Sequence, residues 1–245
     1  MAASPLMARK VGIAVLLLAL AAPPALAGQA AGPTAPGAPA SAPNAPGAAN
    51  PGMTIANEGT KQGAPACATC HGARGEGQPA SGFPRLAGLN AAYILHQLAS
   101  FADGSRANPI MQPVATALTG PERSAVAAYF AGLPLPAAAE AKAATPVDPR
   151  GAELALHGDW GVGVPACESC HGPGAMGVGT SFPPLAGQNA AYISAQLEAW
   201  QAGTRHDDPL GLMGGVASRL TKRDIGAVAG YFAALPTPPP PEAKP

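Results

Sequence analysis

The chain has 245 residues and a formal net charge of zero, with 14 Lys and Arg against 14 Asp and Glu. Aromatic residues make up 4% of it and charged residues 11%, beside 31 Gly and 30 Pro. The sequence has no basic patch of the kind that indicates nucleic-acid binding. Small domains with so few aromatic side chains lack the apolar volume for a core of their own. This shortage favours domains that are built around a prosthetic group.

The N-terminus predicts a secretory signal peptide over residues 1–27. Arg9 and Lys10 precede an apolar run over 11–22, and Ala25-Leu26-Ala27 has the small-x-small pattern of a cleavage site. A run of this length falls short of the about 20 residues that span a bilayer, so cleavage is favoured over an uncleaved anchor. The mature protein is expected in the periplasm. Residues 28–52, mostly Ala, Pro and Gly, predict a disordered tether, and a loose membrane association of this tether stays open.

All four cysteines fall in two pentapeptides, Cys67-Ala-Thr-Cys70-His71 and Cys167-Glu-Ser-Cys170-His171. Two thiols three positions apart and followed at once by histidine are the pattern that attaches haem covalently. The cysteines would bind the cofactor as thioethers, and the two histidines would each bind an iron. The chain is therefore expected to carry two haem c groups and no disulfide. Zinc is disfavoured, because thiolates in separate repeats give poor tetrahedral geometry.

A duplication extends beyond the cysteines, since residues 83–94 return almost unchanged at 182–193. The period of about one hundred residues suits a small domain better than a solenoid repeat. The predicted organisation is a first domain over 53–135, a linker over 136–149, a second domain over 150–236 and a proline-rich tail over 237–245.

Each copy predicts helices joined by loops rich in Gly and Pro. Helices are expected over 90–102 and 189–202, each starting at an Asn that suits an N-cap. A final helix in each copy starts near Thr119 or Thr221 and ends at Leu-Pro, because proline disfavours helix in the residue before it. No stretch alternates with period two, so the fold class is all-α. Residues 57–66 are poor in apolar side chains, which predicts a short first helix in the first copy.

The iron ligand opposite each histidine is predicted to be methionine, whose thioether favours reduced iron. Met111 and Met213 are the candidates, because both are followed by Ala and Leu at the same offsets and both precede the last helix of their copy. Met176 has no counterpart and is the next candidate for the second copy. His96, His157 and His206 have no duplicated partner, and we interpret these three as surface or packing residues.

These motifs resemble class I cytochromes c, and their tandem arrangement resembles the dihaem cytochrome c4 family over residues from about 55 to 236. The resemblance implies two class I domains, each wrapped around one haem. It implies that the backbone carbonyls of Pro84 and Pro183 accept a hydrogen bond from the haem-ligating histidines. It also implies that Arg106 and Arg205 lie near haem propionates, although solvated arginines in loops remain an equal alternative.

The expected function is electron transfer without catalysis, because closed six-coordinate sites leave no position for a small-molecule substrate. The family implies redox protein partners: a quinol-oxidising complex, a terminal oxidase or a dehydrogenase. Two alternatives remain, an electron-accepting subunit of a dehydrogenase complex and a dihaem enzyme such as a peroxidase. Residues 150–236 hold seven acidic and five basic groups, against four and five in 53–135. Since negative charge stabilises ferric iron, the C-terminal haem is expected to have the lower potential.

Overall fold

The computed structural model describes residues 50–135 and 148–237. The predicted signal peptide, the tether up to residue 49, the linker over 136–147 and the tail from residue 238 lie outside these ranges. Within the described ranges every regular element is helical, and the only β pairing consists of isolated bridges. The predicted all-α fold is confirmed. None of the described helices has the length and apolar character needed to cross a membrane.

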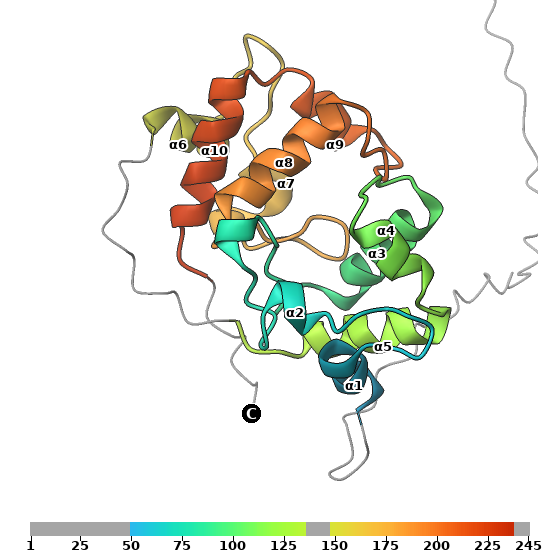
Figure 1. Ribbon diagram of the computed structural model, residues 1–245. Coiled ribbons are helices and arrows are strands. Elements are labelled where there is room, and N and C mark those ends of the chain that lie inside the picture. The colour runs from blue at the N-terminus through green and yellow to red at the C-terminus, as the bar shows by residue number, and fades with distance from the viewer. Residues whose placement is uncertain (1–49, 136–147, 238–245) are drawn as a thin grey trace, which may run out of the picture. The chain divides into compact units, whose positions relative to one another are not determined.

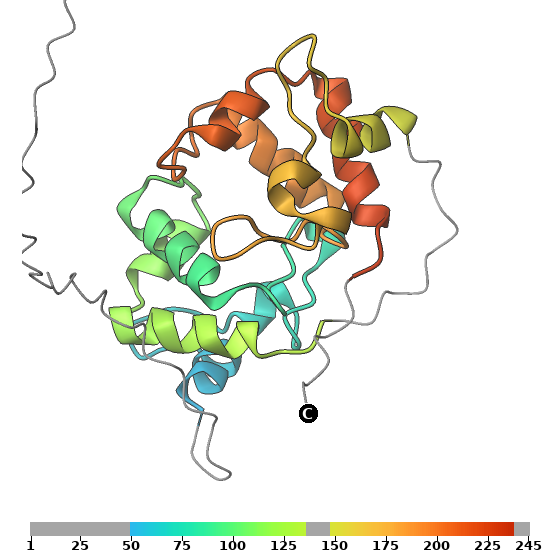
Figure 2. The ribbon, with the colours of Figure 1, turned by 180° about the vertical axis from the view of Figure 1, so that it is seen from behind.

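The two halves repeat one order of elements, as the blue-to-green and yellow-to-red parts of Figure 1 and the reverse view in Figure 2 show. The first half contains α1 (Pro51–Glu58), α2 (Ala68–His71), η1 (Pro79–Ser81), α3 (Ala91–Asp103), α4 (Met111–Thr116) and α5 (Gly120–Ala131). The second half contains α6 (Pro149–Leu156), α7 (Glu168–His171), η2 (Pro173–Ala175), α8 (Ala190–Gln201), α9 (Leu212–Ala217) and α10 (Lys222–Ala234).

The predicted starts of the long helices are confirmed by their caps. Asn90 Oδ1 accepts from the backbone N–H of Ala92, and Asn189 Oδ1 accepts from that of Tyr192. Thr119 and Thr221 each form a capping box with the acidic residue three positions later, which satisfies free N–H groups in the first turn of α5 and α10. Local side-chain chemistry therefore fixes where α3, α5, α8 and α10 begin.

The first helix of each half packs across the last one, α1 on α5 and α6 on α10. Glycines allow this close crossing: a Cβ on Gly52 would lie 2.2 Å from the Ala125 carbonyl oxygen, and one on Gly151 would lie 2.2 Å from that of Ala227. Helix α1 begins two residues before the predicted domain boundary at 53 because Asn50 caps it and Pro51 occupies its first turn.

The first helix of the first copy is short, as predicted, but it is no shorter than its counterpart in the second copy. Helix α1 has eight residues, as many as α6. It begins upstream of the stretch that was poor in apolar residues and overlaps only its first two positions. It buries Gly52, Ile55 and Ala56 where α6 buries Gly151, Leu154 and Ala155.

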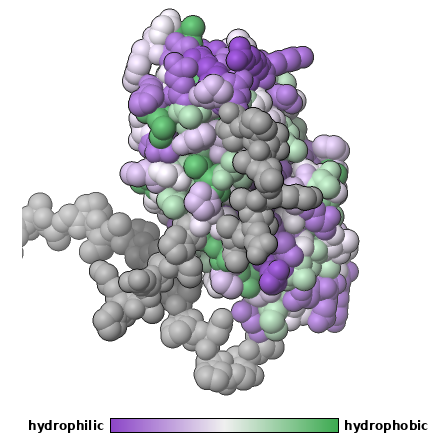
Figure 3. Space-filling model, turned by 90° about the vertical axis from the view of Figure 1, so that its left-hand side faces the viewer, coloured by the Kyte–Doolittle hydropathy of each residue, from purple (hydrophilic) through white to green (hydrophobic). Residues whose placement is uncertain are grey.

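Each half has its own apolar core beneath the crossing helices. The first includes Ile94, Leu98, Phe101, Val126 and Phe130, and the second includes Leu154, Ile193, Leu197, Ile225 and Phe232. Charged residues gather instead at the outer end of the second half, where α6 meets the start of α10, as the hydrophilic upper end of Figure 3 shows. There Arg150 forms ion pairs with Glu153, Asp159 and Asp224.

The halves are joined by reciprocal hydrogen bonds. The backbone N–H of Ala107 donates to Thr204 O at 2.8 Å, and that of His206 donates to Ser105 O at 2.8 Å. Side chains form a second reciprocal pair of hydrogen bonds between the halves. Arg106 donates to Gln196 Oε1 at 2.6 Å, and Arg205 donates to Gln97 Oε1 at 2.9 Å. The same residues of each copy thus bind their counterparts in the other copy.

Candidate haem sites

The two pentapeptides fold into single helical turns, α2 and α7, which begin directly after Cys67 and Cys167 and end at the histidines. Cysteines three positions apart lie on one face of such a turn, so each pair can bind one cofactor. All four thiols are free of disulfides. Burial raises the pKa of the Cys67 thiol, and it raises the pKa of the Cys167 thiol to about 11.

Both histidines are held in one orientation and one tautomer. His71 Nδ1 lies 2.9 Å from Pro84 O, and His171 Nδ1 lies 2.8 Å from Pro183 O. A carbonyl oxygen can only accept, so Nδ1 carries the proton and Nε2 has the lone pair for a metal. Each histidine is 6% exposed, and this burial lowers the pKa of both imidazoles, partly opposed by the proline carbonyls. The expected proline contacts are confirmed.

The methionines of the matched pair occupy equivalent places in the two halves. Met111 begins α4 and Met213 lies in the first turn of α9, and both are half-buried against the core of their half. Each backbone N–H is bound by a side chain just before it, Asn108 Oδ1 at 2.8 Å and Asp208 Oδ2 at 2.5 Å. Met176 differs from both, because it is 41% exposed.

The three unpaired histidines lie on the surface of the described halves. His96, His157 and His206 are all exposed. His96 Nε2 lies 3.0 Å from the Asp207 carbonyl oxygen and donates to it across the junction of the halves, while His157 forms the C-cap of α6. Their interpretation as surface or packing residues is confirmed.

The residues present fit a haem in each half. Each half supplies two unpaired thiols, one buried imidazole with a free Nε2 and one half-buried thioether, which is the donor set of a haem c. In addition, Trp200 Nε1 is buried without a hydrogen-bond partner among the described residues. A buried N–H rarely remains unpaired, so this position in the second half fits a bound cofactor that would supply the acceptor missing among the described residues.

Sequence reasoning missed most of the polar network between the halves. Arg106 and Arg205 are each 5% exposed, so their alternative interpretation as solvated loop residues is wrong. The side-chain oxygens of Gln97 and Gln196 accept hydrogen bonds from both arginines. The signal was present in the sequence, because a Gln recurs at the same place on two otherwise apolar helix faces.

Arg85 is a third buried arginine at this junction. It is 2% exposed, and its side chain donates to the carbonyl oxygens of Ala87 and Ala186. Its backbone exchanges two hydrogen bonds with the Gln188 side chain of the other half. Its counterpart in the second copy is Pro184, so the repeat gave no indication of its role.

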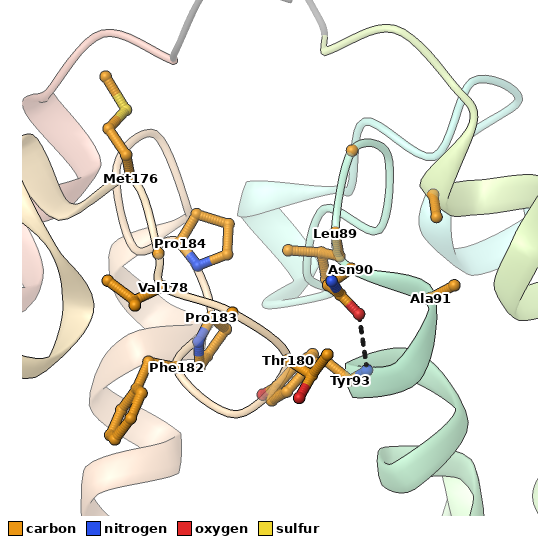
Figure 4. A pocket seen from close by; sticks show the side chains of 14 residues that line it. Leu89, Asn90, Ala91, Tyr93, Met176, Val178, Thr180, Phe182, Pro183 and Pro184 are labelled. Atoms are coloured by element: carbon orange, nitrogen blue, oxygen red, sulfur yellow. Dashed lines mark hydrogen bonds between the residues drawn. The ribbon is translucent and has the colours of Figure 1, made fainter. Parts of the chain in front are cut away.

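A cavity of about 370 Å³ lies between the two halves beside the proline of the second site. Figure 4 shows the segment with Leu89, Asn90 and Ala91 facing the loop that carries Val178, Thr180 and Pro183. The carbonyl of Pro183 at its edge is the one that orients His171.

Two haem-attachment turns, each with a carbonyl-oriented histidine inside a small helical half, define a c-type cytochrome with two haems. A cytochrome c family model matches residues 56–134. The "thiosulfate dehydrogenase electron acceptor" of Stutzerimonas stutzeri strain A1501 is 51% identical over 175 residues, which are 71% of this chain and 81% of that protein.

Two solved structures are similar to this chain. Reduced recombinant cytochrome c4 from Pseudomonas stutzeri has a TM-score of 0.61 and 32% identity, and the match covers 69% of this chain and 93% of that one. The thiosulfate dehydrogenase TsdBA from Marichromatium purpuratum has a TM-score of 0.71 and 45% identity over 80% of this chain. This chain spans 44% of that longer protein. The chain belongs to the dihaem cytochrome c4 family; it transfers electrons and binds two haem c groups covalently.

Proposed function

We propose that His71 and Met111 bind the iron of the first half, and that His171 and Met213 bind the iron of the second. Bound haem c supplies a reversible one-electron change between ferrous and ferric iron. The cysteine pairs hold the cofactor, and the proline carbonyls orient the imidazoles. The single observation that carries this proposal is that the histidine and the methionine occupy equivalent positions in the two halves.

The matched methionines support a carrier rather than a catalyst. Both methionines are packed against the core of their half, and if they bind the irons as proposed, they would leave no coordination position for a substrate. We therefore propose that the chain catalyses no reaction on a small molecule, and that its partners are other redox proteins.

We further propose that the electron donor is a periplasmic thiosulfate dehydrogenase. The support is the resemblance to the Stutzerimonas stutzeri protein, which is named as the electron acceptor of such an enzyme. The Marichromatium purpuratum structure adds support, because it is a thiosulfate dehydrogenase and its TM-score of 0.71 with this chain exceeds the 0.61 of cytochrome c4. The predicted signal peptide supports the periplasm as the place of this exchange.

The donor is tested by following reduction of the oxidised holoprotein in the visible spectrum. Thiosulfate together with a purified thiosulfate dehydrogenase should reduce both haems, whereas thiosulfate alone should reduce neither within the same time. A quinol-oxidising complex with its quinol is the comparison. Fast reduction by that complex and none by the dehydrogenase would contradict the proposed donor and favour a general respiratory carrier.

The ligands are tested by three methionine variants. Met111→Ala should abolish the weak sulfur-to-iron charge-transfer band of one haem, and Met213→Ala should abolish that of the other. Met176→Ala is the matched control, because Met176 is exposed and should leave both bands intact. If Met213→Ala keeps both bands and Met176→Ala loses one, the assignment in the second half is wrong.

A further inference from the structure

A tight turn over residues 159–164, the Trp160 turn, holds two apolar side chains out in solvent. It is the yellow loop that projects past α6 and α10 at the top of Figure 1, and the reverse view in Figure 2 agrees. Trp160 is 74% exposed and Val162 is 54% exposed. The turn leads into the second haem-attachment turn, because Cys167 follows three positions after Val164.

Hydrogen bonds across the base of the Trp160 turn keep its tip in one shape. The backbone N–H of Asp159 donates to Val164 O at 2.7 Å, and that of Val164 donates to Asp159 O at 2.9 Å. The Asp159 carboxylate also accepts from Arg150 at 2.6 Å, which fixes the turn to α6. A side chain that is held in place before binding loses little conformational entropy when a partner covers it.

The equivalent turn of the first half shows that the fold does not require an apolar tip. Its base closes in the same way, since the backbone N–H of Thr60 donates to Ala64 O at 2.9 Å. Its tip is one residue shorter and carries the exposed Lys61 and Gln62. The apolar tip of the second half therefore serves something other than folding, and exposed tryptophan is typical of the side chains that dominate protein interfaces.

The charges around the Trp160 turn are balanced and mostly paired within the second half. This end of the half carries as many basic as acidic groups: Asp148, Arg150, Glu153, Asp159, Arg219, Lys222, Arg223 and Asp224. Arg150 forms ion pairs with three of the carboxylates, and Arg223 forms one with the fourth. The complementary surface is therefore an uncharged apolar pocket. A membrane surface would instead select an excess of Lys and Arg.

The exposed tip is too small for a stable dimer of this chain. Two side chains of this size offer on the order of a few hundred Å², whereas a stable interface buries about 800 Å² on each partner. Contacts of this small size are typical of transient encounters between electron-transfer proteins. A redox partner that docks, reacts and leaves fits the tip better than a second copy does.

We propose that the Trp160 turn is the docking site for the electron donor, a thiosulfate dehydrogenase whose apolar pocket accepts the Trp160 indole. Val162 packs at the edge of this pocket. This inference rests on the proposed donor. Each encounter transfers one electron from the thiosulfate-reduced enzyme to a ferric iron of this chain, and no covalent bond forms or breaks between the two proteins.

The test is steady-state turnover of purified thiosulfate dehydrogenase with the holoprotein as electron acceptor. Trp160→Gln should raise the KM for the holoprotein by about tenfold to thirtyfold at an unchanged kcat, equivalent to about 1.4–2 kcal/mol. Val162→Gln should raise it by about threefold. Met53→Gln is the matched control, because Met53 is 47% exposed on the first half, and should leave the KM unchanged. None of these substitutions changes the net charge.

The salt dependence tests the uncharged character of the contact. Raising the salt concentration from about 0.05 M to about 0.5 M should change the KM of the unaltered holoprotein by less than about threefold. A rise of tenfold or more would show that opposite charges lead the docking, and it would overturn the inference.

The remaining outcomes separate the docking site from the donor on which it depends. If the dehydrogenase does not reduce the unaltered holoprotein, the proposed donor is wrong and the docking site falls with it. If it does, and Trp160→Gln raises the KM no more than Met53→Gln, the docking site alone is wrong. Sedimentation velocity tests the second copy, because a dimer that Trp160→Gln dissociates would assign the turn to self-association and overturn the inference. Unchanged haem spectra and unfolding midpoints show that the variants are folded.

Discussion

The close crossing of α6 and α10 leads to a prediction about stability. In Gly151→Ala the new Cβ would lie 2.2 Å from the Ala227 carbonyl oxygen and 2.9 Å from Tyr231 Cβ, whereas ordinary contact begins at 3.4 Å. Neither neighbour is the end of a flexible side chain, so the helices must separate by about 1 Å. Overpacking of this kind costs about 1–3 kcal/mol, and the better helix propensity of Ala returns about 0.5–1 kcal/mol. The net expectation is a loss of about 1–2 kcal/mol.

The partner helix supplies a matched control. A Cβ on Gly226, in α10, would meet no heavy atom within 4 Å, so Gly226→Ala should stabilise the protein by about 0.5–1 kcal/mol through helix propensity alone. Guanidinium unfolding of the holoproteins, followed by circular dichroism, should move the two midpoints in opposite directions at an unchanged slope. The crossing in the first half repeats the test, because Gly52→Ala meets the same obstruction. Unchanged or raised stability of Gly151→Ala would refute the packing argument.

The other predictions concern the cofactors and the pH dependence of stability. Cys167→Ala with Cys170→Ala should leave one haem on the denatured polypeptide instead of two, measured by haem absorbance after extraction; two remaining haems would contradict the attachment site. The reduced protein should bind carbon monoxide slowly and incompletely at neutral pH, since the proposed methionine ligands would occupy both irons; rapid complete binding would indicate an open site. The Thr221 and Arg150 hydrogen bonds outweigh desolvation and hold the pKa of Asp224 below its usual range. Its contribution to stability is therefore present above the unfolded pKa of about 3.9 and lost as pH falls through the folded pKa. Arg150→Met should flatten this acid-side loss in unfolding midpoints, and an unchanged pH profile would argue against the Arg150 ion pair.

The sequence by itself determined the features that depend on neighbouring residues. The haem-attachment turns follow from cysteines and a histidine within five positions, and the helix starts follow from side chains that cap their own first turn. The duplication then identified equivalent residues, because two copies of one fold place the same positions alike. These local rules were enough for the fold class and for the candidate ligands.

Only the tertiary structure decided what the junction of the halves contains. Burial of Arg85 depends on Ala186 and Gln188, about one hundred residues away, and no local pattern reports such contacts. The crossing of α1 on α5 was also not predicted, because the close approach at Gly52 depends on Ala125 and Tyr129, more than seventy residues away. A side chain's solvation and charge environment are set by what packs on it from elsewhere in the chain. For this reason the sequence predicted equivalent ligands in the two halves, and the structure showed which buried side chains surround those residues.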